Sequence, residues 1–171
     1  MQITAQEEYG LRCIVQVARR QSDAQVTIGA IAEAEGLSKQ YVAKLLHRLH
    51  QAGLITSSRG LRGGYRLGRL PHQISIAEVM DAMGGMVQSR RRRKAFCETY
   101  VGKRPQCVHL SNCSVRPMWF VLMRHITEIL HTLTLHDLLN EETLATQKIE
   151  QYFGHIGEPP LERAAAGGMN V

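Results

Sequence analysis

The sequence predicts a mainly α-helical protein that carries one small β-hairpin and continues into one long helix. Three observations lead to this fold class. Apolar residues recur at helical spacing through the front of the chain, a glycine-rich turn separates two short β-type runs, and a long apolar stripe starts at Pro117. We therefore expect a winged helix-turn-helix, in which the hairpin is the wing, followed by a long helix.

Three helices are predicted before the hairpin. The first spans residues 5–20, where apolar side chains spaced at i, i+3, i+4 and i+7 form one stripe. Thr27 suits the N-cap of a short second helix, which ends at Gly36. Ser38 can cap a third helix that stops at Gly53. The apolar side of this third helix consists of Val42, Leu45, Leu46 and Leu49.

The hairpin and a fourth helix follow. The β-type runs LITS and YRLG flank the turn RGLRGG, which predicts a wing directly after the third helix. Ser75 and Glu78 have the spacing of a capping box and start a fourth helix that ends at Gly84 and Gly85. Residues 1–85 are therefore interpreted as one winged helix-turn-helix domain.

Positive charge is concentrated in the front of the chain. The formal net charge is +6. Residues 1–70 hold ten Lys and Arg against five Asp and Glu, and residues 90–94 are five consecutive basic side chains. This asymmetry favours a polyanionic partner, with double-stranded DNA first. An ordinary basic solvated surface is the alternative interpretation.

The third helix has the two faces that a recognition helix needs. Its polar face carries Gln40, Ala43, Lys44 and His47. In the major groove Gln40 can pair with adenine, Lys44 can donate to guanine, and Ala43 can touch a thymine methyl group. We expect this face to read the bases.

Other basic residues suit the DNA backbone. Lys39, Arg48 and the start of the third helix can contact phosphates, which position a protein without reading sequence. The glycines of the wing let Arg59 and Arg62 reach a minor groove or the flanking phosphates. The predicted DNA-binding residues are Ser38, Lys39, Gln40, Ala43, Lys44, His47, Arg48, Arg59 and Arg62.

Residues 86–115 show no periodicity and are predicted to be a functional loop. The loop holds Cys97, Cys107 and Cys113, which lack the paired CxxC spacing of structural zinc sites. Three thiols within 17 residues are still a good set for a soft metal, an iron–sulfur cluster first. A disulfide-forming thiol switch, a zinc site and three independent reduced cysteines remain as alternatives.

The surroundings of the cysteines leave two questions open. The basic run Arg90 to Lys94 has two competing roles, which are to balance an anionic cluster or to contact DNA phosphate. The loop also offers only three cysteines where a cluster takes four ligands. Cys13 lies in the first helix and is predicted to be a small core residue. His109 and His125 are further candidates, although a single histidine is more often a surface residue.

The stripe that starts at Pro117 predicts a long helix, with Met118, Leu122, Ile126, Ile129 and Leu133 on one side. Because this stripe is too apolar to face water, we expect it to pack against a second copy of the chain. Packing against its own domain is the alternative. Asn140 can cap a last helix that reaches about Phe153. Residues 116–153 are thus predicted to hold a dimerisation helix and a C-terminal helix, and residues 154–171 a disordered tail.

Several classes of protein are disfavoured. The longest apolar run is too short for a bilayer, and no secretory signal is recognised, so a cytoplasmic protein without a membrane partner is expected. The sequence shows no nucleophile–base pair or phosphate-binding loop, so no enzyme and no small-molecule substrate are expected. An electron-transfer protein or enzyme is the rival from another class.

Several segments together resemble one family, the Rrf2 family of bacterial transcription regulators, over roughly residues 1–140. The wing pattern RGxxGGYxLG is specific to that family. The segments are ITAQEEYGLR, IAEAEGLSKQYVAKLLHRLHQAGLITSSRGLRGGYRLGR, ISIAEVMDAMGG, the three-cysteine loop and the later LHDLL. The resemblance implies a homodimeric winged-helix regulator that binds DNA and senses redox state, iron or nitric oxide through a bound cluster.

The resemblance also implies a ligand set. The family's cluster cysteines match Cys97, Cys107 and Cys113, and Glu8 matches an acidic residue that a partner subunit supplies in the family's nitric-oxide sensor. It therefore favours a [4Fe-4S] cluster over a [2Fe-2S] cluster. Three departures stand out. The gap between Cys97 and Cys107 is longer than in the family's cluster-assembly regulator and nitric-oxide sensor. Arg116 replaces the histidine ligand of the cluster-assembly regulator, and Ala43 and Lys44 replace its Glu and Gln, so a different DNA sequence is expected.

Overall fold

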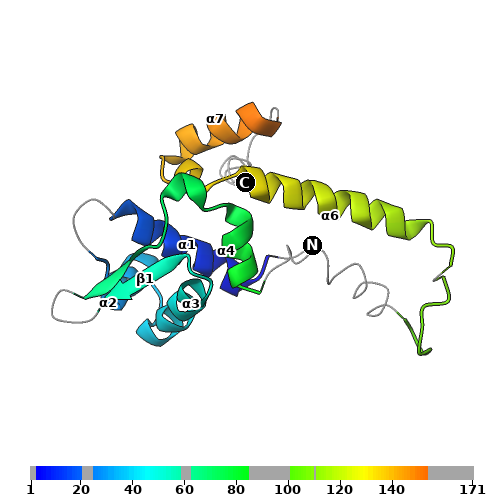
Figure 1. The fold of residues 1–171 in the computed structure, drawn as a ribbon, viewed down its shortest axis with the longest axis horizontal. Helices are drawn as coiled ribbons and strands as arrows, with labels where there is room; N and C mark the ends of the chain where they lie inside the picture. Colours follow the sequence, from blue (N-terminus) through cyan, green and yellow to red (C-terminus); the bar gives the residue numbers. More distant parts are fainter. Residues whose placement is uncertain (1–2, 21–24, 59–62, 85–100, 110, 154–171) are drawn as a thin grey trace, which may run out of the picture. The chain divides into compact units, whose positions relative to one another are not determined.

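The structure is a computed structural model that describes residues 3–20, 25–58, 63–84, 101–109 and 111–153 (Figure 1). These residues belong to two compact units, one ending at Leu139 and the other starting at Asn140. Among the described residues, no helix is both long enough and apolar enough to cross a bilayer. The predicted fold class, mainly α-helical with a β-hairpin, is confirmed.

Three helices form the front of the first unit: α1 (Ala5–Arg19), α2 (Ile28–Glu35) and α3 (Lys39–Gln51). Both predicted N-caps are present, since Thr27 accepts a hydrogen bond from Ala30 N and Ser38 accepts one from Tyr41 N. Gly36 ends α2 in the left-handed conformation, with φ of 65°. The three helices enclose a core that includes Ile14, Ile31, Leu45, Leu46 and Leu49, each fully buried.

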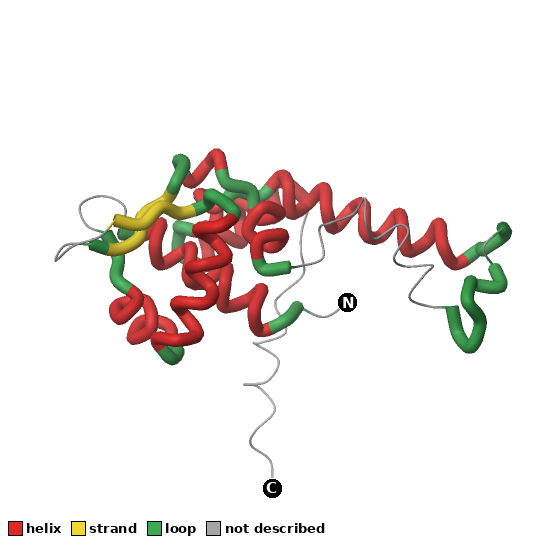
Figure 2. Tube along the Cα trace, turned by 60° about the horizontal axis from the view of Figure 1, so that its bottom comes forward, coloured by secondary structure: helices red, strands yellow, loops and turns green. Residues whose placement is uncertain are grey.

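The wing is an antiparallel hairpin of β1 (Ile55–Ser58) and β2 (Gly64–Leu67), drawn in yellow in Figure 2. Val26 forms a bridge to Tyr65 on the other side of β2, with hydrogen bonds in both directions. A β-carbon on Gly64 would lie 2.7 Å from the carbonyl oxygen of Val26. Glycine is thus needed at position 64, because any side chain would push this third segment away.

A short 3-10 turn, η1 (Pro71–Gln73), leads into α4 (Ile76–Ala82). The predicted capping box is complete. Ser75 Oγ accepts from Glu78 N, and the Glu78 carboxylate accepts from Ser75 N. The box fixes the point at which α4 begins.

The long helix α6 spans Val115–Thr132 and is followed by a second 3-10 turn, η2 (Leu135–Leu138). It begins two residues before the predicted Pro117, which sits in the first turn, where a proline is tolerated. At its other end, Ile76 N donates to Leu133 O (2.9 Å), and Leu135 N donates to Ile74 O (2.8 Å). These backbone bonds attach the end of α6 to the start of α4.

The second unit contains α7 (Glu142–Phe153), the last helix that the sequence predicts. Several sequence-based predictions fall outside the described residues. They are the wing residues Arg59 and Arg62, the run Arg90 to Lys94, Cys97 and the tail 154–171.

Candidate nucleic-acid interface and cysteine segment

Helix α3 presents two sharply different faces. Val42, Leu45, Leu46 and Leu49 are all fully buried, which holds the helix on the core. Gln40, Lys44 and His47 are exposed on its polar face, and Ala43 is half-buried beside them. The donors and the methyl group that could read DNA bases therefore share one accessible side of a firmly packed helix.

Three of the predicted phosphate contacts lie at the ends of α3. Ser38 and Lys39 are exposed at its start, where the hydroxyl oxygen of Ser38 is already the N-cap. Arg48 is half-buried near its end, and its Nη1 donates to the carbonyl oxygen of Met83 at 3.4 Å. Gln6 Nε2 donates to the same oxygen. Arg48 thus joins α3 to the C-terminal end of α4.

A polar cluster joins α1 to α2. Arg12 Nε and Gln16 Nε2 both lie 2.6 Å from carboxylate oxygens of Glu35, whose side chain is only 5% exposed. The Arg12 guanidinium also lies over the ring of Tyr9, which meets Tyr41 of α3 edge-on. These contacts hold the helix-turn-helix as one piece.

The strands of the wing carry a basic residue that is not among the DNA-binding residues predicted from the sequence. Arg66 is exposed on β2, and its Nε donates to Thr56 Oγ1 on β1 at 3.2 Å. Its neighbour Leu67 is buried, so the alternation of the strand turns Arg66 outward. That alternation, visible in YRLG, is the signal that could have identified Arg66.

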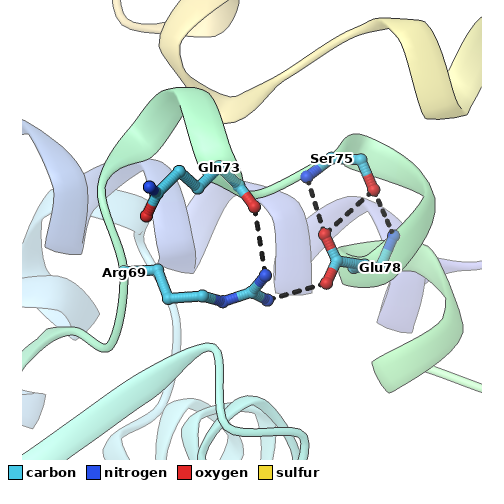
Figure 3. Close-up of polar contacts among 4 residues, drawn as sticks. All are labelled: Arg69, Gln73, Ser75 and Glu78. Carbon is cyan, nitrogen blue, oxygen red and sulfur yellow. Dashed lines mark hydrogen bonds and ion pairs between the residues drawn. The ribbon is translucent and has the colours of Figure 1, made fainter.

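The base of the wing is tied to α4 by Arg69 (Figure 3). Its Nη2 donates to Glu78 Oε1 at 2.7 Å, and its Nη1 donates to the carbonyl oxygen of Gln73 at 3.1 Å. Burial tends to raise the pKa of Glu78, but the hydrogen bonds from Arg69 and Ser75 outweigh it and hold that pKa below its ordinary value. Glu78 is therefore a stable anion at neutral pH.

The cysteine segment is described only in part. Cys107 and Cys113 are half-buried free thiols in the segment before α6, whereas Cys97 lies outside the described residues. Glu8 is exposed in the first turn of α1. Within the described ranges, no three His, Cys, Asp or Glu side chains are grouped closely enough to hold a metal ion.

The remaining candidates for the cysteine site have other surroundings. Cys13 is fully buried among the core residues, as predicted. Arg116 Nη2 donates to the carbonyl oxygen of His109 at 3.0 Å, which folds the segment back onto the first turn of α6. His125 is exposed on α6 and lies 3.4 Å from a carboxylate oxygen of Glu128.

Comparison with known proteins agrees with this arrangement. The model of the Rrf2 family, described as an iron-dependent transcriptional regulator, matches residues 3–141. Protein rrf2 of Nitratidesulfovibrio vulgaris is 31% identical, over 84% of this chain and 91% of that protein. The HTH-type transcriptional regulator IscR of Xenorhabdus nematophila is 32% identical, over 84% of this chain and 83% of that protein.

A solved structure shows the same fold. CymR, the global cysteine regulator of Bacillus subtilis, superposes with a TM-score of 0.65 at 24% identity, covering 81% of this chain and 96% of that one. The family model and the IscR relative are described as transcriptional regulators and not as enzymes, which agrees with the expectation from the sequence. The chain therefore belongs to the Rrf2 family and is a DNA-binding transcription regulator.

Proposed function

We propose that this regulator binds DNA as a homodimer, reads the major groove with α3, and adjusts its DNA affinity through a metal cluster on its cysteines. The main observation behind the proposed DNA-binding surface is that α3 has one apolar and one polar face. Four apolar side chains are fully buried on one face, and Gln40, Lys44 and His47 are exposed on the other. The exposed residues offer donors at the spacing that a recognition helix uses.

The backbone contacts of this proposal come from both sides of the recognition helix. Ser38 and Lys39 stand at its exposed start, and Arg66 extends from the wing. Arg59 and Arg62, in the turn of the wing, are proposed to enter the minor groove or to contact phosphates. Arg48 contacts phosphate in this proposal only with the part of its guanidinium that Met83 leaves accessible.

The operator can be identified with the full chain. Wild-type protein is used to select duplexes from a random-sequence library, and the enriched duplex then serves as the probe for affinity measurements. A reproducible enriched motif is expected. Recovery of random sequence at low salt, with no motif, would refute sequence-specific reading by this surface.

The second copy is proposed to cover α6. This helix is described over its whole length and buries none of its residues. Val115, Met118, Val121 and Leu122 are between 46% and 53% exposed along its first two turns. Such a row of large apolar side chains is unfavourable in water and is the kind of surface that an identical helix covers in a symmetric dimer.

The chemistry of the cysteines suits an iron–sulfur cluster. Cys107 and Cys113 are free thiols, half-buried rather than enclosed, and near the exposed cations Lys103 and Arg104 in sequence. Thiolates are the usual ligands of such clusters, which would supply a redox-active centre when bound. We propose Cys97, Cys107 and Cys113 as three ligands and Glu8 of a second subunit as the fourth, with [4Fe-4S] favoured over [2Fe-2S].

Anaerobic purification tests the cluster proposal. Visible absorption and iron and sulfide analysis should show a cluster in the wild-type protein and its loss in Cys107→Ser. A Glu8→Ala variant should retain iron less well. A colourless protein after anaerobic reconstitution would refute the cluster. A zinc content near one per chain, or a disulfide mass shift with DNA affinity following it, would then identify the zinc site or the thiol switch instead.

A further inference from the structure

The side chain of Arg69, at the end of the wing, is held in place by two hydrogen bonds. It lies two residues after β2 and uses both arms of its guanidinium, one on Glu78 and one on the carbonyl oxygen of Gln73 (Figure 3). The Arg69 and Glu78 side chains are about equally exposed, at 40% and 39%. The fork of the guanidinium is thus engaged with the protein in two directions, which restrains its orientation.

Glu78 uses its two carboxylate oxygens for two different purposes. Oε1 accepts from Arg69 Nη2, whereas Oε2 accepts from Ser75 N at 2.9 Å and from Ser75 Oγ at 3.1 Å. The same carboxylate therefore completes the capping box of α4 and holds the end of the wing. A movement of Arg69 relative to α4 would break an ion pair and leave the capping box intact.

The same turn is also the attachment point of α6. Ser75 and Thr134 form a bridge, flanked by the hydrogen bonds from Ile76 N to Leu133 O and from Leu135 N to Ile74 O. Thr134 stands at the start of η2, where its N and Oγ1 both donate to Asp137 Oδ2. The wing, the start of α4 and the end of α6 thus meet within a few residues of Ser75.

We infer that Arg69 and Glu78 are positioning residues for DNA binding. They set the orientation of the wing relative to α4 and to the end of α6, and Arg69 does not contact DNA. The inference rests on the proposed role of the wing in the DNA surface. If Glu78 positions the wing, removing its negative charge should weaken binding to DNA, although DNA is itself a polyanion.

A double-mutant cycle tests the pair. The variants are Arg69→Gln, Glu78→Gln and the double substitution, each as the full chain. Glutamine at position 78 keeps an oxygen for Ser75 N, so the capping box survives while the ion pair is lost. Fluorescence anisotropy measures the affinity for the duplex selected with wild-type protein, over a range of salt concentrations.

If the pair positions the wing, each single variant should bind the selected duplex roughly 3- to 10-fold more weakly than wild type. The double variant should then bind no more weakly than either single variant. The salt slope should fall by less than one, because Arg69 itself makes no phosphate contact in this proposal. A direct contact by Arg69 predicts the opposite pattern. Arg69→Gln would lower the salt slope by about one, and Glu78→Gln would bind as well as wild type or more tightly. That pattern would overturn the inference.

Arg69→Lys separates positioning from a simple need for positive charge. Lysine can reach Glu78 but cannot hold the Gln73 carbonyl with the same planar fork, so only part of the affinity should return. Thermal unfolding of the same variants gives the second readout. Lower stability with wild-type DNA affinity would mean that the pair only stabilises the fold, which also overturns the inference.

Arg66→Gln is the matched control. Arg66 lies three residues before Arg69 and is exposed on β2, so its loss should lower the salt slope by about one. If Arg66→Gln behaves in this way but Glu78→Gln does not weaken binding, the positioning inference alone fails. If Arg66→Gln and Lys44→Ala both leave affinity unchanged, the proposed DNA surface itself is wrong.

Discussion

Gly10 of α1 lies directly against Met83, at the C-terminal end of α4. A β-carbon on Gly10 would lie 2.5 Å from Met83 Cγ and closer still to its Sδ. Met83 is 1% exposed, so its side chain has no open space into which it could turn. The two helices can approach this closely only because residue 10 has no side chain. The same end of α4 receives Gln6 and Arg48, so α1, α3 and α4 are joined there.

Gly10→Ala is expected to destabilise the fold. Overpacking in a core costs about 1–3 kcal/mol. The better helix propensity of alanine offsets up to about 1 kcal/mol of this cost. We therefore expect a net loss of up to about 2 kcal/mol in the free energy of unfolding, measured by urea denaturation. Gly29→Ala in α2 is the control, because its β-carbon would meet its neighbours at 3.8 Å, an ordinary contact. Equal stability of both variants would contradict this explanation.

Cys13 should make stability depend on pH in the alkaline range. Burial, followed by the nearby Glu35 carboxylate, raises the pKa of its thiol from 9.0 to about 12. The unfolded chain therefore loses this proton near pH 9, while the folded chain keeps it. The contribution of Cys13 is complete below about pH 9 and declines as the pH rises toward 12, by at most about 1.4 kcal/mol per pH unit.

The comparison with Cys13→Ala isolates this effect from other groups that titrate above pH 9. The difference in unfolding free energy between wild type and Cys13→Ala should shrink between pH 9 and 10.5. Iodoacetamide at pH 8 should also leave Cys13 unmodified until urea unfolds the chain, as mass spectrometry of its peptide would show. A difference that stays constant with pH would argue against the buried, neutral thiol.

Base reading by α3 predicts a loss that depends on DNA sequence. Lys44→Ala should weaken binding to the selected duplex by about 1–3 kcal/mol and relax the preference at one base position, since a lost base contact removes discrimination there. Arg124→Ala is the control, because it removes an exposed cation from α6 and not from the DNA surface. If Lys44→Ala weakens all duplexes equally, Lys44 contacts phosphate instead of a base.

Local signals in the sequence were sufficient for the elements. The caps Thr27 and Ser38 and the left-handed Gly36 lie within four residues of the groups they serve, so they could be predicted without knowing the fold. The pairing of Arg69 with Glu78 could not be predicted, because nothing in the sequence distinguishes Arg69 from the other basic residues near the wing. The bond from Ile76 to Leu133 joins positions 57 residues apart, and no periodicity marks it.

In the candidate site, too, local features could be predicted from the sequence and contacts between distant segments could not. The faces of α3 follow from helical spacing, because one amphipathic helix contains its own signal. The contact of Arg48 with Met83 depends on how α3 crosses α4, so sequence reasoning treated Arg48 as a plain phosphate contact. The ligand set of the cysteines depends on packing between distant segments and, in our proposal, on a second subunit. It therefore stays a prediction.

Dimerisation through α6 is the last prediction. Leu122 is 46% exposed in the apolar row of α6, and in a symmetric dimer each substitution occurs twice. Burying one leucine contributes about 1.5–3 kcal/mol, so Leu122→Glu should weaken association by orders of magnitude. Sedimentation velocity at micromolar concentration should show a dimer for wild type and a monomer for Leu122→Glu. Arg124→Ala, a substitution of an exposed polar residue on the same helix, should remain dimeric. A wild-type chain that sediments as a monomer would rule out α6 as a self-association surface and leave its exposed leucine and methionine for a different partner.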